Sequence, residues 1–269
     1  MARTQRLREL QRRGLDDLAR FGQPQFSDTW FPYTSGEVGP FYIQSIVVEQ
    51  DGAAYRRSVE ALCELIEATV GGDAFDAVSG GESRDWDFSN PVAAFLAKPH
   101  IKIYKDGRLL GASPSGCRIV HVADLNNQGS SMRDVWAPVL RAAGGRIVHA
   151  FFFVDRLEDG VGVLEDLGIP SAAVVPLDGE AWRYLRDIEY ISDGMYASLE
   201  RRRADKRAWA IEALRRHIDP LGRMLESPRQ SEVARAMRIL EVGYPEHRAE
   251  LIELLGRSGY RVPDLRDRR

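Results

Sequence analysis

The feature that most constrains the fold is a regular alternation of apolar strand segments and helical segments between residues 75 and 177. The strand segments recur at residues 75–81, 100–105, 118–124, 146–155 and 172–177. Helical patterns separate most of them, including a helix expected over 90–97 with proline near its first turn. Strands that read as continuous apolar runs are typical of a parallel sheet covered by helices on both faces. The sequence therefore predicts an α/β protein with a mainly parallel sheet, whose ligands bind beyond the carboxyl ends of the strands.

The segments on either side of this alternation have different patterns. An amphipathic helix is expected over residues 5–20, bent or broken near Gly14, followed by one or two strands in 31–50 and a helix over 53–70. Three helices are expected over 195–258. The sequence thus predicts three parts: an N-terminal helix and hood segment (1–50), a core (51–192) and a helical extension (193–269).

Composition narrows the class of protein. Apolar residues make up 44% of the 269 residues, enough to form a large core without disulfides, so Cys63 and Cys117 are expected to be free thiols in a reducing compartment. A net charge of −3 does not favour nucleic acid as a partner, and the mixed run at 201–207 fits a solvated helix face better. The basic start lacks the apolar core of a signal peptide, and no run approaches the roughly 20 apolar residues of a membrane helix. We therefore expect a cytoplasmic protein.

The most informative local pattern is "VADLNNQGSS" at residues 122–131, which joins a strand to a helix. The strand brings Asp124 to its carboxyl end, and Gly129 permits close approach of the backbone to a ligand. Backbone N–H groups at a helix N-terminus attract phosphate. The alternative is a simple strand–helix turn with Ser130 as the N-cap.

A second candidate segment is "SGGESRDWDFSNP" at residues 79–91. It brings charged and aromatic side chains to the carboxyl end of another strand. Glu82 and Arg84 are candidate substrate-binding residues there. One of the acidic residues Glu82, Asp85 and Asp87 could add a carboxylate for a metal ion, Arg84 could bind a phosphate, and Trp86 could stack on a ligand. The alternative is a solvated loop in which Trp86 packs inward and Arg84 pairs with Asp85 or Asp87.

Other chemistry has less support. His121 and His149 lie in apolar strands and are expected to be hydrogen-bonded core histidines rather than a metal pair. No set of histidine, cysteine and acidic residues has the spacing of a zinc site. Ser89 and Ser115 have no visible base partner for serine hydrolase chemistry.

Four segments, in this order along the chain, resemble the type I phosphoribosyltransferases, and the orotate phosphoribosyltransferases most closely. "SGEVGPFYI" (35–43) is similar to the family's "S-G-x-x-S-P-Y-F", and "VSGG" (78–81) to its pyrophosphate-binding turn. "VADLNNQGSS" is similar to "V-E-D-V-x-T-T-G-x-S", and the segment 153–170 to "V-D-R-x-E-G-G" with a later leucine and "G-I". The resemblance covers about residues 14–190.

This resemblance implies a homodimeric enzyme that transfers phosphoribosyl from phosphoribosyl pyrophosphate to a nitrogenous base such as orotate, with Mg²⁺ and release of pyrophosphate. It implies catalytic roles for Asp124 and Lys105, with Asp124 also near the metal ion through water and the ribose hydroxyls. Residues implied to bind the phosphates are Asn127, Gln128, Gly129, Ser130, Ser131, Gly80 and Gly81. Those implied to bind the base are Arg156, whose guanidinium suits a carboxylate, and Phe41 and Tyr42.

The chain also departs from the family pattern. Ala123 replaces the first acidic residue of the pair, Gln128 replaces a threonine, and Thr34 stands where the family has a lysine. The segment between Lys105 and Gly116 is too short for the family's mobile basic loop. Two alternatives therefore remain open at this point: a non-catalytic nucleotide- or phosphosugar-binding regulator on the same fold, or a structural role for the C-terminal helices without any ligand.

Overall fold

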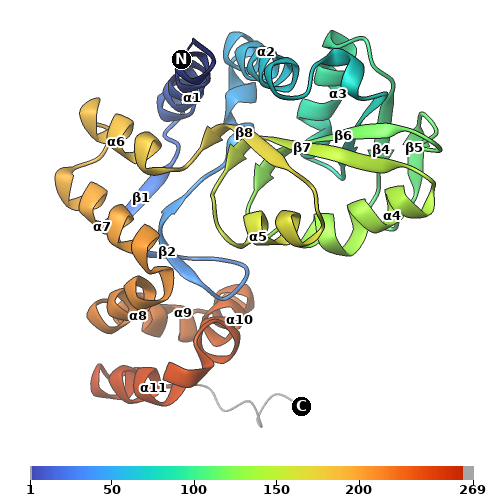
Figure 1. Cartoon of the computed structure of the whole chain (residues 1–269). Coiled ribbons are helices and arrows are strands. Elements are labelled where there is room, and N and C mark those ends of the chain that lie inside the picture. The colour runs from blue at the N-terminus through green and yellow to red at the C-terminus, as the bar shows by residue number, and fades with distance from the viewer. Residues whose placement is uncertain (1, 263–269) are drawn as a thin grey trace. The chain divides into compact units, whose positions relative to one another are not determined.

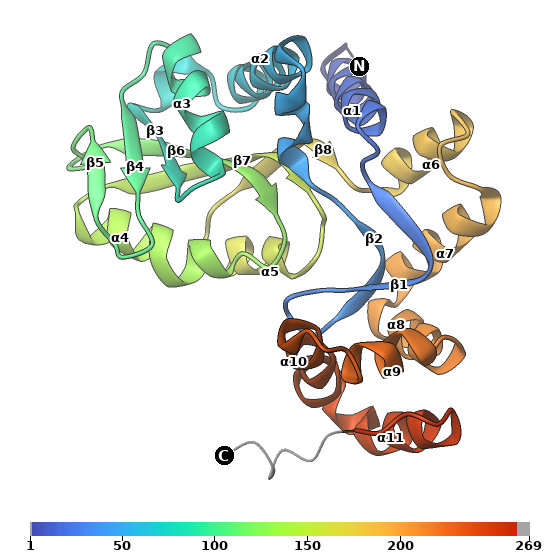
Figure 2. The same ribbon diagram turned by 180° about the vertical axis from the view of Figure 1, so that it is seen from behind.

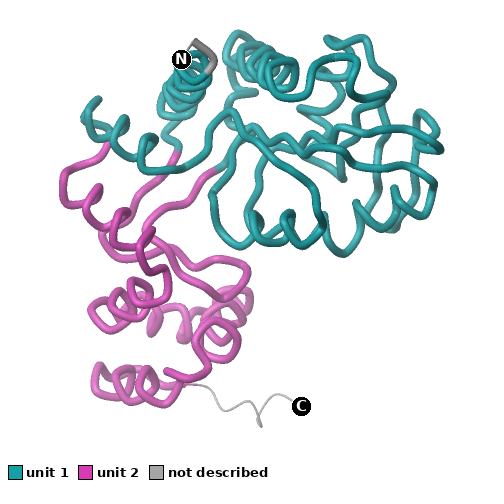
Figure 3. Tube along the Cα trace, in the orientation of Figure 1, with its two compact units in different colours: residues 1–23, 44–190 teal, residues 24–43, 191–269 magenta. Residues whose placement is uncertain are grey.

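The computed structural model describes residues 2–262, and side chains from residue 4 onward. The chain divides into two compact units (Figure 3). The first unit combines residues 1–23 with 44–190, and the second combines residues 24–43 with 191–269. The expected hood segment 1–50 is therefore divided between the two units, and each unit is built around its own core.

A six-stranded sheet forms the centre of the first unit (Figure 1). Its strands are β3 (Ala77–Gly81), β4 (His100–Ile103), β5 (Leu109–Gly111), β6 (Arg118–Asn126), β7 (Arg146–Asp155) and β8 (Ser171–Pro176). The order across the sheet is β5-β4-β3-β6-β7-β8. All neighbouring strands are parallel except β4 and β5, which are antiparallel. The predicted mainly parallel α/β sheet is confirmed, and β5 is an edge strand that the sequence analysis missed.

Helices cover both faces of this sheet (Figure 2). One face carries α1 (Ala2–Arg20), α2 (Gly52–Thr69) and α3 (Asp85–Phe95), and the other carries α4 (Ala137–Ala142) and α5 (Asp159–Asp166). The helix α6 (Gly179–Asp187) packs against α1. Shorter helical turns lie at Ser45–Gln50, Gly72–Ala74 and Met132–Trp136. Buried aromatic side chains fill the space beneath α3, where Phe88 stacks on Phe153 with ring centroids 5.3 Å apart.

The predicted bend near Gly14 is wrong, because α1 continues through this residue. A β-carbon at Gly14 would lie 2.4 Å from Cγ2 of Val175 in β8. The glycine therefore permits close packing of the helix on the sheet, and does not interrupt it. The helix expected at 90–97 begins earlier, at Asp85, and contains Pro91 in its interior.

The second unit joins a β-ribbon to a group of helices. The ribbon pairs β1 (Gln25–Pro32) with β2 (Val38–Tyr42) in an antiparallel manner. The helices are α7 (Asp193–Ala204), α8 (Lys206–Arg216), α9 (Asp219–Leu225), α10 (Gln230–Arg238) and α11 (Arg248–Arg257), with turns at Ile239–Gly243 and Pro245–His247. The extension is thus more finely divided than the three helices expected from the sequence.

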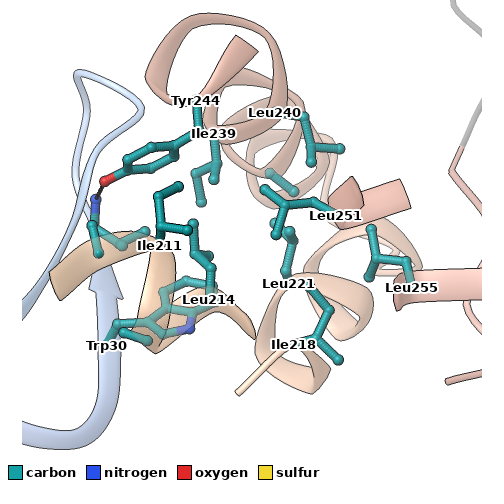
Figure 4. Close-up of a cluster of buried hydrophobic side chains, with 14 of the residues drawn as sticks. Trp30, Ile211, Leu214, Ile218, Leu221, Ile239, Leu240, Tyr244, Leu251 and Leu255 are labelled. Carbon is teal, nitrogen blue, oxygen red and sulfur yellow. Dashed lines mark hydrogen bonds between the residues drawn. The ribbon is translucent and has the colours of Figure 1, made fainter. Parts of the chain in front are cut away.

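The core of the second unit explains why the ribbon belongs to it (Figure 4). Trp30 is buried among side chains of these helices, and its indole Nε1 donates a hydrogen bond of 3.0 Å to the carbonyl of His217. The hydroxyl of Tyr244 accepts a hydrogen bond of 3.1 Å from the backbone N–H of Val38. Among the described residues, no helix is both long and apolar enough to cross a membrane.

Candidate active site

The site is built at the carboxyl ends of β3 and β6, around Asp124. The side chain of Asp124 is 7% exposed, and its Oδ2 accepts a hydrogen bond of 2.7 Å from the hydroxyl of Ser45. Ser45 opens the short helical turn before α2. A buried carboxylate needs such donors, and this one is oriented by a residue 79 positions away in the chain.

A second carboxyl group, from Asp85, lies against Asp124. Asp85 is held at the start of α3, where its Oδ2 accepts a hydrogen bond of 3.1 Å from the backbone N–H of Gly81. Burial, and then the charge and contact of Asp124, raise the pKa of Asp85 well above its usual value. Nε2 of His121 lies 3.9 Å from the same oxygen. The site thus holds two carboxyl groups, although Ala123 stands where the family pattern has an acidic residue.

Two further acidic residues surround this pair. Burial, and then the charges of Asp87 and Asp124, raise the pKa of Glu49. Burial and the charge of Asp124 likewise raise the pKa of Asp87. In the described part of the chain, no three acidic, histidine or cysteine residues form a group that could hold a metal ion by themselves. Mg²⁺ is usually bound by one or two carboxylates together with substrate phosphates, so this set of oxygen donors fits Mg²⁺ arriving with its ligand.

The loop after β6 offers unused backbone donors. Gly129 has a φ of +65°, and its carbonyl accepts a hydrogen bond of 3.0 Å from Arg133 as the helix begins. The carbonyl of Asn127 accepts a hydrogen bond of 2.8 Å from the N–H of Gly160. Within the described residues, the N–H groups of Gln128 and Gly129 donate no hydrogen bond, and neither Ser130 nor Ser131 caps the helix with its hydroxyl. The capped-turn alternative is therefore not observed.

The two glycines that end β3 are required by packing. A β-carbon on Gly80 would lie 2.1 Å from the hydroxyl of Ser89, and one on Gly81 would lie 2.3 Å from the indole of Trp136. Both glycines are buried. Their backbone is thus held firmly beside Asp85, at the turn that was expected to approach pyrophosphate.

The loop at 82–87 packs inward more than the functional interpretation assumed. The indole Nε1 of Trp86 donates a hydrogen bond of 2.9 Å to the carbonyl of Gly80, and Nζ of Lys102 lies 5.2 Å from the indole centroid. Oε2 of Glu82 accepts a hydrogen bond of 2.9 Å from the backbone N–H of Lys105. Trp86 therefore braces the turn, as the alternative interpretation expected.

Two basic side chains of this region are open to solvent. Lys105 and Arg84 are both exposed, and within the described part of the chain Arg84 has no ion pair with Asp85 or Asp87. The expected pairing of Arg84 is thus not observed. The roles assigned to Lys105, Glu82 and Arg84 stay predictions.

Arg156 follows β7 and is buried. Its Nη2 donates a hydrogen bond of 3.0 Å to Oε1 of Glu158, and both side chains are 5% exposed. Nearby, the carboxylate of Asp155 accepts hydrogen bonds from the backbone N–H of Leu157 and from the amide of Asn126. Glu158 therefore already partners the guanidinium that was expected to bind a substrate carboxylate.

The remaining predicted residues have simpler surroundings. Phe41 and Tyr42 belong to β2 in the second unit, where Phe41 is buried and Tyr42 is 38% exposed, and their role at the base stays a prediction. His121 Nδ1 forms a hydrogen bond of 3.0 Å with the hydroxyl of Ser79, as expected for a core histidine. His149 stacks on Phe151 with ring centroids 4.4 Å apart, but its buried Nε2 has no hydrogen-bond partner among the described residues, so the expectation of a hydrogen-bonded histidine is wrong there.

Sequence reasoning missed part of this arrangement. Ser45 and Glu49 were not singled out, because nothing in the local pattern links them to a strand end far away in the chain. Asp85 was recognised only as one of several charged residues in its loop. The signal that could have distinguished it is its place in the first turn of a helix directly after a glycine turn.

Comparison with solved structures assigns this fold to the type I phosphoribosyltransferases. The orotate phosphoribosyltransferase of Aeropyrum pernix superposes with a TM-score of 0.57 at 23% identity, covering 65% of this chain and 99% of its own. The UMP synthase of Leishmania donovani superposes with a TM-score of 0.60 at 22% identity, covering 68% of this chain and 40% of its own. No family model matches the sequence.

Curated relatives narrow the family further. The orotate phosphoribosyltransferase of Sulfolobus acidocaldarius is 30% identical over 150 residues, which are 54% of this chain and 74% of the relative. That of Sinorhizobium medicae is 28% identical over 156 residues, and the chain spans 65% of its length. The chain belongs to the orotate phosphoribosyltransferase family.

Proposed function

We propose that this protein transfers the phosphoribosyl group of phosphoribosyl pyrophosphate to orotate and releases pyrophosphate. The observation that carries the proposal is the Asp85–Asp124 carboxyl pair. Asp124 lies near the end of β6, and the loop that follows this strand contains backbone N–H groups that donate no hydrogen bond. Carboxylates suit ribose hydroxyls and a hydrated Mg²⁺ ion, and free N–H groups suit a phosphate.

In this proposal each group has one task. The N–H groups of Gln128 to Ser131 bind the 5-phosphate, and the carboxylate of Asp124, oriented by Ser45, accepts hydrogen bonds from the ribose hydroxyls. Asp85 takes over the task of the acidic residue that Ala123 replaces. When it is bound with the pyrophosphate, Mg²⁺ supplies positive charge to the leaving group.

The reaction breaks the bond between C1 of the ribose and the pyrophosphate oxygen and forms a bond from C1 to a ring nitrogen of the base, which releases its N–H proton to solvent. Pyrophosphate leaves with the electron pair, and positive charge develops on the ribosyl centre. The carboxylate of Asp124 stabilises that charge, because fixed negative groups act strongly in a site that excludes water. The exposed Lys105 is proposed to contact the departing pyrophosphate.

Arg156 enters the proposal with a condition. Its pairing with Glu158 neutralises the guanidinium, so an orotate carboxylate must either displace Glu158 or bind to the remaining N–H groups. Substituting Glu158→Gln tests this point, since it removes the carboxylate charge that Glu158 presents to the guanidinium. We expect a lower KM for orotate in this variant, and an unchanged KM would remove Arg156 from the proposed base site.

The test of the function is pyrophosphate release from phosphoribosyl pyrophosphate, measured with Mg²⁺ in the presence and absence of orotate. We expect orotate-dependent release, reduced at least a hundredfold by Asp124→Asn, while the matched exposed variant Asp106→Asn retains the rate. Binding of phosphoribosyl pyrophosphate without release from orotate or another base would instead support the regulatory alternative. Absence of any binding would overturn both.

A further inference from the structure

A pocket lies wholly within the second unit. The carboxyl pair and the loop at 126–131 belong to the first unit. Its walls come from β1, α7 and α8, which lie side by side in Figure 1 and Figure 2. Its volume is about 170 Å³. Pockets for drug-sized ligands start at roughly 300 Å³, so this pocket fits a smaller molecule.

Charged residues of both signs line this pocket. Arg201 is contributed by α7 and Arg216 by α8, while Asp28 and Glu212 contribute carboxylates from β1 and α8. Over the described residues, none of these four side chains takes part in an ion pair or a side-chain hydrogen bond.

Neighbouring charges in the same helices are paired. Arg203 binds Glu200, Arg207 binds Glu246 and Arg215 binds Glu250. The arginines that line the pocket thus differ from those on the outer surface of the same helices. A ligand that brings its own charge and hydroxyl groups would supply the missing partners.

The uncharged part of the lining also favours a polar ligand. The hydroxyls of Ser27 and Thr29 lie 3.0 Å apart on β1, and the hydroxyl of Ser198 accepts a hydrogen bond of 2.9 Å from the indole of Trp209. Each hydroxyl keeps hydrogen-bonding capacity beyond these contacts. Met195 adds one apolar wall.

We propose that this pocket binds a small phosphorylated sugar. Arg201 and Arg216 bind the phosphate, because planar guanidinium groups match its oxygens in pairs. Asp28 and Glu212 accept hydrogen bonds from the sugar hydroxyls, which a bare phosphate ion lacks. The size of the pocket favours a pentose phosphate over a complete nucleotide.

Ribose 5-phosphate is the probe for the test, with titration calorimetry on the full-length protein. Because the loop at 126–131 could also bind the probe, the titration uses Ser131→Asp, which places a carboxylate at that loop. We expect one remaining site, weakened at least tenfold by Arg201→Gln or Arg216→Gln. Arg223→Gln is the matched control, since Arg223 is an exposed arginine of the same unit outside the pocket.

A second comparison separates the phosphate from the sugar. Asp28→Asn and Glu212→Gln should weaken the binding of ribose 5-phosphate at least threefold. The binding of inorganic phosphate should be unchanged or tighter in both variants. Loss of all binding in Ser131→Asp, or equal effects of Arg216→Gln and Arg223→Gln, would overturn the proposal. Equal affinity for phosphate and ribose 5-phosphate would overturn its sugar-binding part. All substituted side chains are exposed, and an unchanged melting temperature confirms that each variant folds.

Discussion

The carboxyl group of Asp85 lies against that of Asp124, although 39 positions separate them in the chain and they reach the site from different elements. Asp124 comes from β6 and Asp85 from the first turn of α3. Two carboxyl groups in a buried position oppose each other's ionisation. The arrangement costs stability in the free protein and gives a ready site for hydroxyl groups and a hydrated cation.

The first prediction concerns the stability cost of this pair. The pKa of Asp85 is raised in the folded protein, so this carboxyl lowers the free energy of unfolding above the unfolded pKa of about 3.9. Asp85→Asn should therefore raise Tm at neutral pH. A gain of 1 kcal/mol in the free energy of unfolding would raise Tm by about 2–4 °C. The gain should shrink as the pH falls towards 4. Thermal unfolding from pH 4 to 8 measures it, and a loss of stability at neutral pH would contradict the assignment.

Ser45 should act as a positioning residue for Asp124. Ser45→Ala removes the 2.7 Å hydrogen bond and leaves one carboxylate oxygen of Asp124 without that donor. We expect about tenfold weaker binding of phosphoribosyl pyrophosphate, equivalent to about 1.4 kcal/mol, and recovery in Ser45→Thr.

Ser58→Ala is the control for Ser45. Ser58 is also a buried serine, but its hydroxyl donates to the carbonyl of Ala54 inside α2. This control should change stability without changing binding. Equal binding losses in Ser45→Ala and Ser58→Ala would show a general effect on folding and would remove the positioning role.

The glycine turn at the end of β3 should tolerate no β-carbon. Gly81→Ala places a methyl group against the indole of Trp136, and overpacking of this kind costs about 1–3 kcal/mol. Gly162→Ala offers the opposite case, because Gly162 lies inside α5 with open space around it. It should stabilise the protein by about 0.4–1 kcal/mol. Urea unfolding distinguishes the two, and equal free energies for both variants would be inconsistent with the packing described.

His121 should make the fold sensitive to acid. Burial lowers the pKa of His121 to about 3, so the folded protein takes up this proton only at much lower pH than the unfolded chain, whose histidine pKa is about 6.5. Stability is therefore lost as the pH falls from 6.5 towards 3. His121→Asn should reduce this slope, measured by urea unfolding at several pH values. An unchanged slope in His121→Asn would contradict this role.

Much of the fold was accessible from the sequence, because apolar strands alternate with helices, and β3 and β7 end at a glycine and an acidic residue. The strand ending at Asp124 and the loop through Gly129 were predicted from that pattern. The continuity of α1 through Gly14 was not, since it depends on the distant side chain of Val175.

The contacts of the site were harder to predict, because they join residues far apart in the chain. The pairing of Asp85 with Asp124 depends on the start of α3, which the sequence pattern located five residues too late. The pairing of Arg156 with Glu158 depends on the left-handed backbone of Leu157, with a φ of +54°. Neither the start of α3 nor the backbone conformation of Leu157 produces a periodic pattern in the sequence.

The most direct test of the account is calorimetric binding of phosphoribosyl pyrophosphate, with and without Mg²⁺, to the unsubstituted protein and to Asp85→Asn and Asp124→Asn. If the two carboxyl groups act together, Mg²⁺ will strengthen binding to the unsubstituted protein at least tenfold, and either substitution will remove most of that increase. If Asp85→Asn keeps the full effect of Mg²⁺ while Asp124→Asn loses it, Asp85 does not replace the missing acidic residue and the central claim is wrong.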